Sequence, residues 1–315
     1  MNTLSDLRPV SVAHVTGWPM LALERQMLDI VRERDAFDSL APCLAVAAAN
    51  YHLGSGGRRI RAILALHAGH CLGLTPKDAQ TLAAACELLH NASLIHDDLH
   101  DRDAQRRGQP SVWHKFGDEV AVCAGDLLLS AAYLALSQLD GVARLPALFA
   151  LMHVRIASAI RGQCADLRRP THRVVTLEDY KNIALTKSGA LLSLPTELAL
   201  LAAGQDLALV RARQAAGAFA IAYQMHDDLI DVEADALRKP VEPSVTHQAG
   251  SAAACNIVLI LQCDPSCADA RIEAKKMGLQ HLSLAASASA DLPLNSGGAL
   301  HAMSLQLKDE LECLA

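Results

Sequence analysis

Three aspartates close an apolar stretch of the chain, since Asp97, Asp98 and Asp101 follow residues 83–95. At helical pitch the positions i, i+1 and i+4 share one face, so the three carboxylates should converge on one point. They would also lie at the C-terminal end of a helix, where the helix dipole disfavours anions. Hard divalent cations are the natural counter-charge, and Mg²⁺ usually completes its coordination with substrate phosphate. The cluster therefore predicts a metal-bound phosphate group.

The same pattern occurs a second time in the chain. Residues 226–231 repeat residues 96–101 with one substitution, which places Asp227, Asp228 and Asp231 after another apolar run. A single cluster of this kind is more often a solvated helix end, by about two to one. Two matching copies reverse those odds. They predict two facing carboxylate clusters that hold several metal ions around a diphosphate.

Basic residues accompany both the first cluster and a glycine-rich turn. Arg106 and Arg107 come directly after the first aspartates, and arginine suits bidentate phosphate recognition. Residues 54–57 contain three glycines, and Arg58 and Arg61 open the apolar segment that follows. A solvated basic turn is the simpler interpretation of this second group. Glycine-rich backbone with guanidinium groups at a helix start also suits phosphate capture.

Residues 90–110 and 217–231 resemble the two aspartate-rich motifs of the trans-prenyltransferases, which are polyprenyl diphosphate synthases of the isoprenoid synthase fold. The resemblance is specific, because Asp-Asp-x-x-Asp is followed by Arg-Arg-Gly-x-Pro at the spacing of that family. It covers residues 50–240, about three fifths of the chain. Beyond Asp231 it weakens, since the usual lysine-threonine-proline segment and the basic C-terminal tail are missing.

The resemblance implies a role for each matching residue. The expected catalytic residues are Asp97, Asp98, Asp101, Arg106, Lys187, Asp227, Asp228 and Asp231, and the six aspartates among them would hold about three Mg²⁺. The expected substrate-binding residues are Arg58, Arg61, His90, Arg107, Ser188, Gln224 and Lys239. Gln163 and Asp166 also match a polar motif of the family. Arg58 stands where lysine is usual, Ala62 where proline is usual, and Ser188 where threonine is usual.

The function that the resemblance implies is head-to-tail prenyl transfer from an allylic diphosphate to isopentenyl diphosphate. The residues four and five positions before Asp97 are Ser93 and Ala92, which are small and leave room for a chain longer than fifteen carbons. We expect a twenty-carbon product, geranylgeranyl diphosphate, or a longer one. A class I terpene cyclase and a non-catalytic partner subunit are the alternatives. The basic cluster argues against the first, and the intact aspartates argue against the second.

Composition and periodicity set the fold class. The chain has 315 residues, of which 51% are hydrophobic and 20% charged, and helical periodicity recurs throughout. This predicts an all-α, single-domain helical bundle over residues 1–315, of the isoprenoid synthase type, with a central active-site cavity. Residues 120–139 should form one of its buried helices. The resemblance adds an expected homodimer.

The remaining features exclude other classes of protein. A net charge of −6 and the absence of a basic face give no reason to expect nucleic acid as a partner. Charged residues or proline interrupt the longest apolar runs, so no transmembrane segment is expected. The nine cysteines are odd in number and stand in apolar surroundings, which predicts buried free thiols in a reducing cytoplasm.

Overall fold

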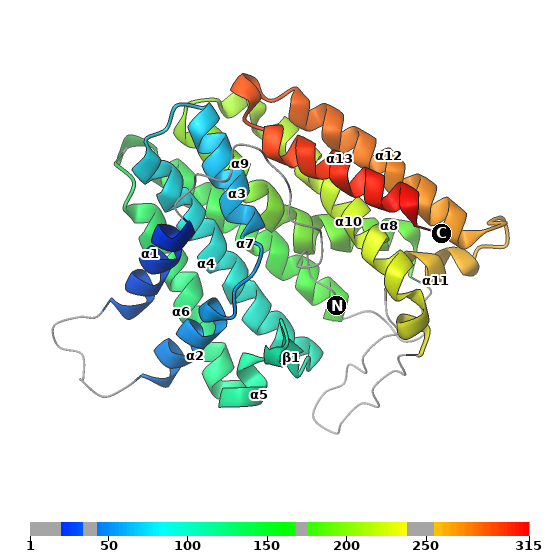
Figure 1. The fold of residues 1–315 in the computed structure, drawn as a ribbon, viewed down its shortest axis with the longest axis horizontal. Coiled ribbons are helices and arrows are strands. Elements are labelled where there is room, and N and C mark those ends of the chain that lie inside the picture. The colour runs from blue at the N-terminus through cyan, green and yellow to red at the C-terminus, as the bar shows by residue number, and fades with distance from the viewer. Residues whose placement is uncertain (1–19, 34–42, 141, 168–174, 238–254, 315) are drawn as a thin grey trace. The chain divides into compact units, whose positions relative to one another are not determined.

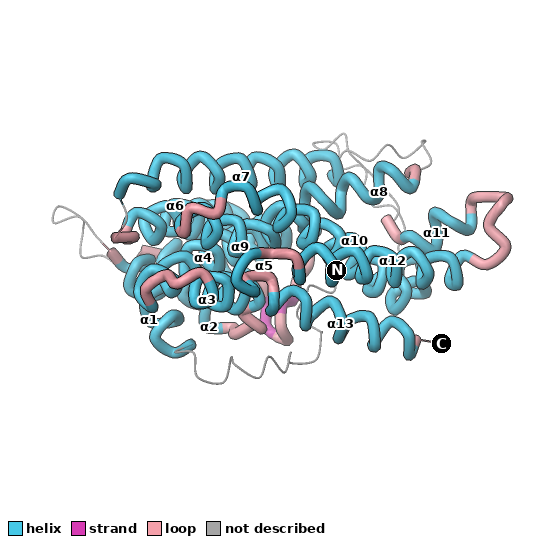
Figure 2. Tube along the Cα trace, turned by 90° about the horizontal axis from the view of Figure 1, so that it is seen from above, coloured by secondary structure: helices cyan, strands magenta, loops and turns pink. Residues whose placement is uncertain are grey.

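The computed structural model describes residues 20–33, 43–140, 142–167, 175–237 and 255–314. These residues form two compact units. Unit 2 contains the described parts of residues 11–150 together with 198–205, and unit 1 contains those of 151–197 and 206–315. Helices account for nearly all of the described backbone (Figure 1, Figure 2). The all-α prediction is confirmed, whereas the single domain over residues 1–315 stays a prediction.

Unit 2 is organised around one long helix. Its helices are α1 (Met20–Arg32), α2 (Leu44–Gly54), α3 (Ile60–Cys71), α4 (Pro76–Asp101), α5 (Val112–Phe116) and α6 (Asp118–Ser137), followed by the 3₁₀ turn η2 (Val142–Arg144). Helix α4 packs against α3 and α6. Its middle is buried on every side, since Leu82, Ala84 and Leu88 are each 0% exposed. A helix that is apolar all round is a core helix, as the composition of this segment predicts.

Clear local signals set both ends of α4. Thr75 precedes the helix in an extended conformation and accepts a hydrogen bond from the backbone N–H of Asp78, while Pro76 occupies the first turn. The helix ends at Asp101, because Arg102 adopts a left-handed conformation with φ 56°. The aspartates of the first motif therefore do lie at a helix end. A short hairpin of β1 (Gln105–Arg106) and β2 (Gln109–Pro110) follows, which the sequence did not predict.

Unit 1 is organised around α10 (Leu209–Leu237), which packs against α12 (Ala270–Ala290). Helix α12 runs side by side with α13 (Gly298–Cys313), as Figure 1 shows. The other elements of the unit are α8 (Leu177–Ile183), the π-helical segment η3 (Ala184–Gly189), α11 (Ile257–Gln262) and the 3₁₀ turns η4 (Asp206–Ala208) and η5 (Pro293–Asn295). Helices α7 (Leu145–Leu167) and α9 (Ala190–Ala202) are divided between the units.

One expectation about helix ends needs correction. The second aspartate motif was expected to close its helix, but α10 continues past Asp231 to Leu237. The interrupted helix pair predicted between Tyr180 and Gly204 is confirmed: the interruption is the π-helical segment, and Pro195 lies inside α9. A π-helix inserts one residue into the turn and is common at functional sites.

The cysteines are free, but most are not buried as predicted. Only Cys86 is buried, and Cys43, Cys123, Cys164, Cys263 and Cys313 are exposed. Cysteine behaves as a small hydrophobic residue, so an apolar neighbourhood in sequence does not decide which face of a helix it occupies.

Helix α6 is the one described helix that is long and apolar enough to cross a membrane. It packs against α4 and α2, and Ala121, Ala124 and Leu128 are fully buried. Core helices of soluble proteins have the same length and composition, so this helix is weak support for a membrane span.

Candidate active site

The first aspartate motif is tied to the hairpin by a buried ion pair. Asp98 is 0% exposed, and its two carboxylate oxygens lie 2.7 and 2.8 Å from Nε of Arg106. Burial raises the pKa of Asp98, and the hydrogen bonds from Arg106 oppose that shift. Asp97 is half-buried and Asp101 is exposed. Both oxygens of Asp98 therefore have a protein partner, while the outer aspartates lie nearer the solvent.

The next arginine of the hairpin, Arg107, contacts the glycine-rich loop. Nη1 of Arg107 donates to Oγ of Ser55 at 3.2 Å and to the backbone carbonyl of Gly56. A Cβ at Gly57 would lie 2.8 Å from Cζ of Arg107, so the absent side chain makes room for the guanidinium group. Arg107 and Gly108 both have positive φ at the tip of the hairpin. Two adjacent arginines thus join one hairpin to the aspartate motif and to the predicted phosphate loop.

The basic cluster creates a strongly positive environment inside unit 2. His90 is half-buried, and its desolvation together with Arg61 and Arg107 holds its pKa well below the usual value. Burial, followed by Arg107, Arg106 and Arg59, lowers the pKa of His52 to about 3. Burial, Arg59 and Arg106 lower the pKa of Arg107 itself to about 10. The two histidines are therefore neutral at pH 7, and the cluster keeps a net positive charge.

Buried donors in this cluster favour a bound anion. Nε of Arg107 is buried and has no hydrogen-bond acceptor within the described residues. A buried donor without an acceptor is costly, and an anion bound beside it would satisfy it. The arginines, the glycine-rich backbone and this donor together fit a diphosphate group.

The second aspartate motif belongs to unit 1, and its middle aspartate is again held by the protein. Oδ2 of Asp228 accepts the backbone N–H of Ile257 at 2.7 Å, and Oδ1 accepts Nε2 of Gln224 at 2.9 Å. Nδ2 of Asn256 donates to the backbone carbonyl of Asp228 at 2.8 Å. Asp228 therefore fixes the start of α11. Gln224, which was expected to bind substrate, contacts this aspartate.

The first aspartate of the same motif is buried as well. Asp227 is 7% exposed, and its Oδ1 lies 3.4 Å from Nδ1 of His226. Burial raises the pKa of Asp227 to about 6, with a further contribution from Asp231 and an opposing one from His226. The expectation that helix-end carboxylates contribute little to the core is wrong for Asp98, Asp227 and Asp228, because all three are buried.

The predicted lysine is also held in unit 1. Nζ of Lys187 lies 2.9 Å from Oδ2 of Asp166, and the two side chains are 13% and 5% exposed. A Cβ at Gly162 would lie 2.4 Å from the backbone nitrogen of Lys187, so only glycine allows α7 to approach the π-helical segment this closely. Ser188 occupies the same segment. Lys239 lies outside the described residues.

The donor set suits Mg²⁺ bound together with a substrate. Within the described part of the chain, no group of three or more potential ligands is arranged to hold a metal ion by itself. Mg²⁺ is commonly held by one or two carboxylates, with waters and substrate phosphates in the other positions. The oxygen-only chemistry of the aspartates and the raised pKa of Asp227 are compatible with a hard cation at these positions.

Sequence reasoning overlooked three residues that organise these sites. Arg59 and Glu87 are buried beside the glycine-rich loop, and Asn256 is buried beside Asp228. Glu87 could have been found, because it is a single acidic residue within the apolar run of residues 83–95. A charge in such a place is retained only when it has a buried partner.

Comparison with known proteins places this chain in a family. The family model of polyprenyl synthetases matches residues 43–266. The short chain isoprenyl diphosphate synthase of Methanothermobacter thermautotrophicus is 31% identical over 234 residues, which cover 70% of this chain and 72% of that protein. The chain therefore belongs to the polyprenyl synthetase family, whose members are prenyltransferases that use Mg²⁺ and elongate prenyl diphosphates head to tail.

Two further comparisons agree with this assignment. The (2E,6E)-farnesyl diphosphate synthase of Mycobacterium tuberculosis is 34% identical over 226 residues, which cover 68% of this chain and 62% of that protein. A crystal structure of polyprenyl synthase from Caulobacter crescentus, complexed with calcium and isoprenyl diphosphate, matches with a TM-score of 0.70 and 20% identity. That match covers 92% of this chain and 94% of the other. The fold is that of the isoprenoid synthases.

Proposed function

We propose that this chain condenses isopentenyl diphosphate with an allylic diphosphate to give a longer trans-polyprenyl diphosphate, of twenty carbons or more. The observation that carries the proposal is the hairpin of unit 2. Through Arg106 it reaches Asp98 of the first aspartate motif, and through Arg107 it reaches Gly56 of the glycine-rich loop. One rigid element thus joins a metal motif to a second, metal-independent phosphate site.

The outer aspartates are the residues that would bind metal. Asp98 and Asp228 have their carboxylate oxygens engaged by Arg106, Gln224 and the backbone N–H of Ile257. The expected metal ligands are therefore Asp97, Asp101, Asp227 and Asp231, with about three Mg²⁺ as the resemblance implies. When bound, the metal ions neutralise the charge that develops on the departing diphosphate.

The other residues act on the substrates directly. Lys187, held by Asp166, would donate to the allylic diphosphate and stabilise it as the carbon–oxygen bond breaks. Arg58, Arg61 and Arg107 would fix the diphosphate of isopentenyl diphosphate, so that its double bond faces the allylic carbocation. His90 stays neutral because of its burial and its arginine neighbours, so it can donate or accept a hydrogen bond there without adding charge.

The product length follows from the small residues of α4. Ala92 is 3% exposed, and Ser93 is half-buried with its Oγ donating to the backbone carbonyl of His90. At about 1.5 Å rise per residue, these positions lie roughly 6–7.5 Å before Asp97. We expect the growing chain to pass them, and Leu89 is the next layer about one turn further along.

The chain is further expected to act as a homodimer. Val122 on α6 is 43% exposed, and Cys123 beside it is also exposed, although the helix is apolar along its length. A second copy of the chain would cover such a surface. Light scattering at micromolar concentration should give the mass of two chains, and a single-chain mass would contradict the expectation.

Binding titrations test the proposal and separate it from the alternatives. Isopentenyl diphosphate should bind with EDTA present, because its site uses side chains and backbone. A thiolo analogue of an allylic diphosphate, which cannot ionise readily, should bind only with Mg²⁺. A terpene cyclase would bind the allylic analogue alone, and a non-catalytic subunit would bind neither with useful affinity. Loss of isopentenyl diphosphate binding in EDTA would overturn the two-site assignment.

A further inference from the structure

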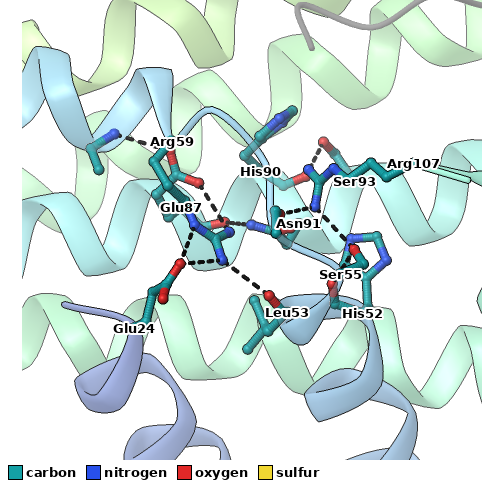
Figure 3. A network of polar contacts seen from close by, with 12 residues as sticks. Glu24, His52, Leu53, Ser55, Arg59, Glu87, His90, Asn91, Ser93 and Arg107 are labelled. Carbon is teal, nitrogen blue, oxygen red and sulfur yellow. Dashed lines mark hydrogen bonds and ion pairs between the residues drawn. The ribbon is translucent and has the colours of Figure 1, made fainter. Parts of the chain in front are cut away.

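The central arginine of the basic loop is surrounded by protein groups on all sides. Arg59 is 7% exposed and lies between α1, α2 and α4 (Figure 3). Its Nε and Nη2 lie 3.2 and 3.1 Å from Oε1 of Glu24, and Nη2 also donates to the backbone carbonyl of Leu53 at 3.0 Å. Its Nη1 is buried and makes no hydrogen bond within the described residues, but it lies 3.8 Å from Oε2 of Glu87, which is within ion-pair distance. The guanidinium group thus connects three segments that are distant in sequence.

Glu87 carries this connection to the start of α3. It is 2% exposed, and its Oε1 accepts the backbone N–H of Ala62 at 3.0 Å. The first amides of a helix have no partner within the helix, so a carboxylate at this point satisfies one of them and interacts favourably with the helix dipole. Glu87 therefore holds both the side chain of Arg59 and the first turn of the helix that Arg59 precedes.

The backbone of Arg59 supports the same interpretation. It precedes α3 in the left-handed conformation, with φ 50° and ψ 38°. Side chains with a Cβ rarely adopt this conformation, and it persists where surrounding contacts determine it. The contacts to Glu24, Leu53 and Glu87 hold Arg59 in this conformation. The direction in which the chain leaves the loop, and hence the direction of Arg58 and Arg61, depends on this residue.

We infer that Arg59 is a positioning residue, which sets the geometry of the isopentenyl diphosphate site through Glu24 and Glu87 without contacting the substrate. The inference rests on the proposed function, in which Arg58 and Arg61 bind that diphosphate. It also gives α1 a role in substrate binding, because Glu24 on that helix contacts Arg59.

Substitution of Glu24 separates this role from direct binding, because the two predict opposite changes. If Arg59 bound the diphosphate itself, removal of the acidic partner would release the guanidinium group and make the site more positive. Isopentenyl diphosphate would then bind more tightly. If Arg59 positions the loop, removal of Glu24 loosens it, and isopentenyl diphosphate binds more weakly.

The experiment compares Glu24→Gln with Asp29→Asn. Asp29 is exposed on the same helix and makes no hydrogen bond or ion pair within the described residues, so both changes remove one negative charge from α1. Glu24→Gln should raise the KM for isopentenyl diphosphate about tenfold, and leave kcat and the KM for the allylic substrate within about twofold. Asp29→Asn should change none of these. Arg59→Lys, which keeps the charge but loses the fork geometry, should resemble Glu24→Gln.

Titration of isopentenyl diphosphate in EDTA provides the second measurement, and thermal unfolding monitors the fold. An unchanged or lower KM in Glu24→Gln overturns the inference, as does a lower Tm with unchanged kinetics, which would make the contact merely structural. If the unaltered protein itself fails to bind isopentenyl diphosphate, the proposed function fails first, and the inference fails with it.

Discussion

Arg106 holds Asp98 through its Nε, which lies 2.7 and 2.8 Å from the two carboxylate oxygens, and Asp98 is completely buried. The middle aspartate of the first motif thus anchors the hairpin that carries Arg107. Asp228 has a similar role in unit 1, where it accepts the backbone N–H of Ile257. In both motifs the middle aspartate organises its neighbours, and we propose the outer aspartates as metal ligands.

This relationship predicts different effects for two aspartates of one motif. Asp98→Ala should destabilise the protein by about 3–5 kcal/mol, because it leaves Arg106 buried without its partner. Asp101→Ala should change the stability by less than about 0.5 kcal/mol, because Asp101 is exposed, yet it should weaken activation by Mg²⁺. Urea unfolding and Mg²⁺ titration of activity measure the two effects. Equal stabilities of the two variants would contradict the anchoring role.

The raised pKa of Asp227 predicts that acid affects the metal-free and metal-bound proteins in opposite directions. Its folded pKa is about 6, above the ordinary value of 3.8, so the folded state binds the proton more tightly. The metal-free protein should therefore gain on the order of 1 kcal/mol from this group as the pH falls from 7 to 5. Mg²⁺ needs the ionised carboxylate, so activation by Mg²⁺ should weaken over the same range.

The matched control for that prediction is Asp227→Asn. The difference in unfolding free energy between the variant and the unaltered protein, measured in EDTA at pH 7 and pH 5, isolates this one group from the other titrations. A difference that is independent of pH would show that Asp227 titrates normally.

The lowered pKa of His52 predicts a loss of stability in acid. The unfolded histidine takes up a proton near pH 6.5, whereas the folded one resists it until about pH 3. Stability from this group is therefore complete above pH 6.5 and is lost as the pH falls below it, by a few kcal/mol at most. His52→Gln should flatten the pH dependence of the unfolding free energy between pH 6.5 and 4. If the two proteins have parallel profiles, His52 is not responsible.

The close approach at Gly162 predicts a selective effect on the allylic substrate. A Cβ there would lie 2.4 Å from the backbone nitrogen of Lys187, so Gly162→Ala must displace the π-helical segment. The pair of Lys187 and Asp166 moves with that segment. We expect the KM for the allylic diphosphate to rise at least about tenfold, while the KM for isopentenyl diphosphate changes little. Gly204→Ala provides a comparison, since it strains an exposed glycine of positive φ in the turn after α9 and not the π-helical segment.

Much of the fold could be predicted, because the sequence of a single segment is often enough to show where a helix begins and ends. The apolar run before Asp97, with Thr75 and Pro76 at its start, predicts α4 almost to the residue. The hairpin at residues 105–110 could not be predicted, because its strands have two residues each and show no alternation. The pairing of Asp98 with Arg106 depends on this hairpin, and the burial of Asp228 depends on Asn256 and Ile257, which lie outside its motif.

The candidate site, too, could be predicted from the sequence only in part. Motif spacing and the family resemblance predicted roles for the aspartates, Arg106, Arg107 and Lys187, and these roles stay predictions. Arg59 stands in the same motif, and its side chain could equally have faced a substrate. Only the positions of Glu24 and Glu87 show that it faces the protein.

The most direct test of the account is the reaction itself. The purified protein is incubated with Mg²⁺, farnesyl diphosphate and labelled isopentenyl diphosphate in excess, and the products are separated by mass after removal of the phosphates. The account predicts a labelled twenty-carbon product that disappears with EDTA, and shorter products from Ala92→Phe. No labelled product with any allylic primer would contradict the proposed function, and a reaction that stops at fifteen carbons would contradict the role given to Ala92 and Ser93.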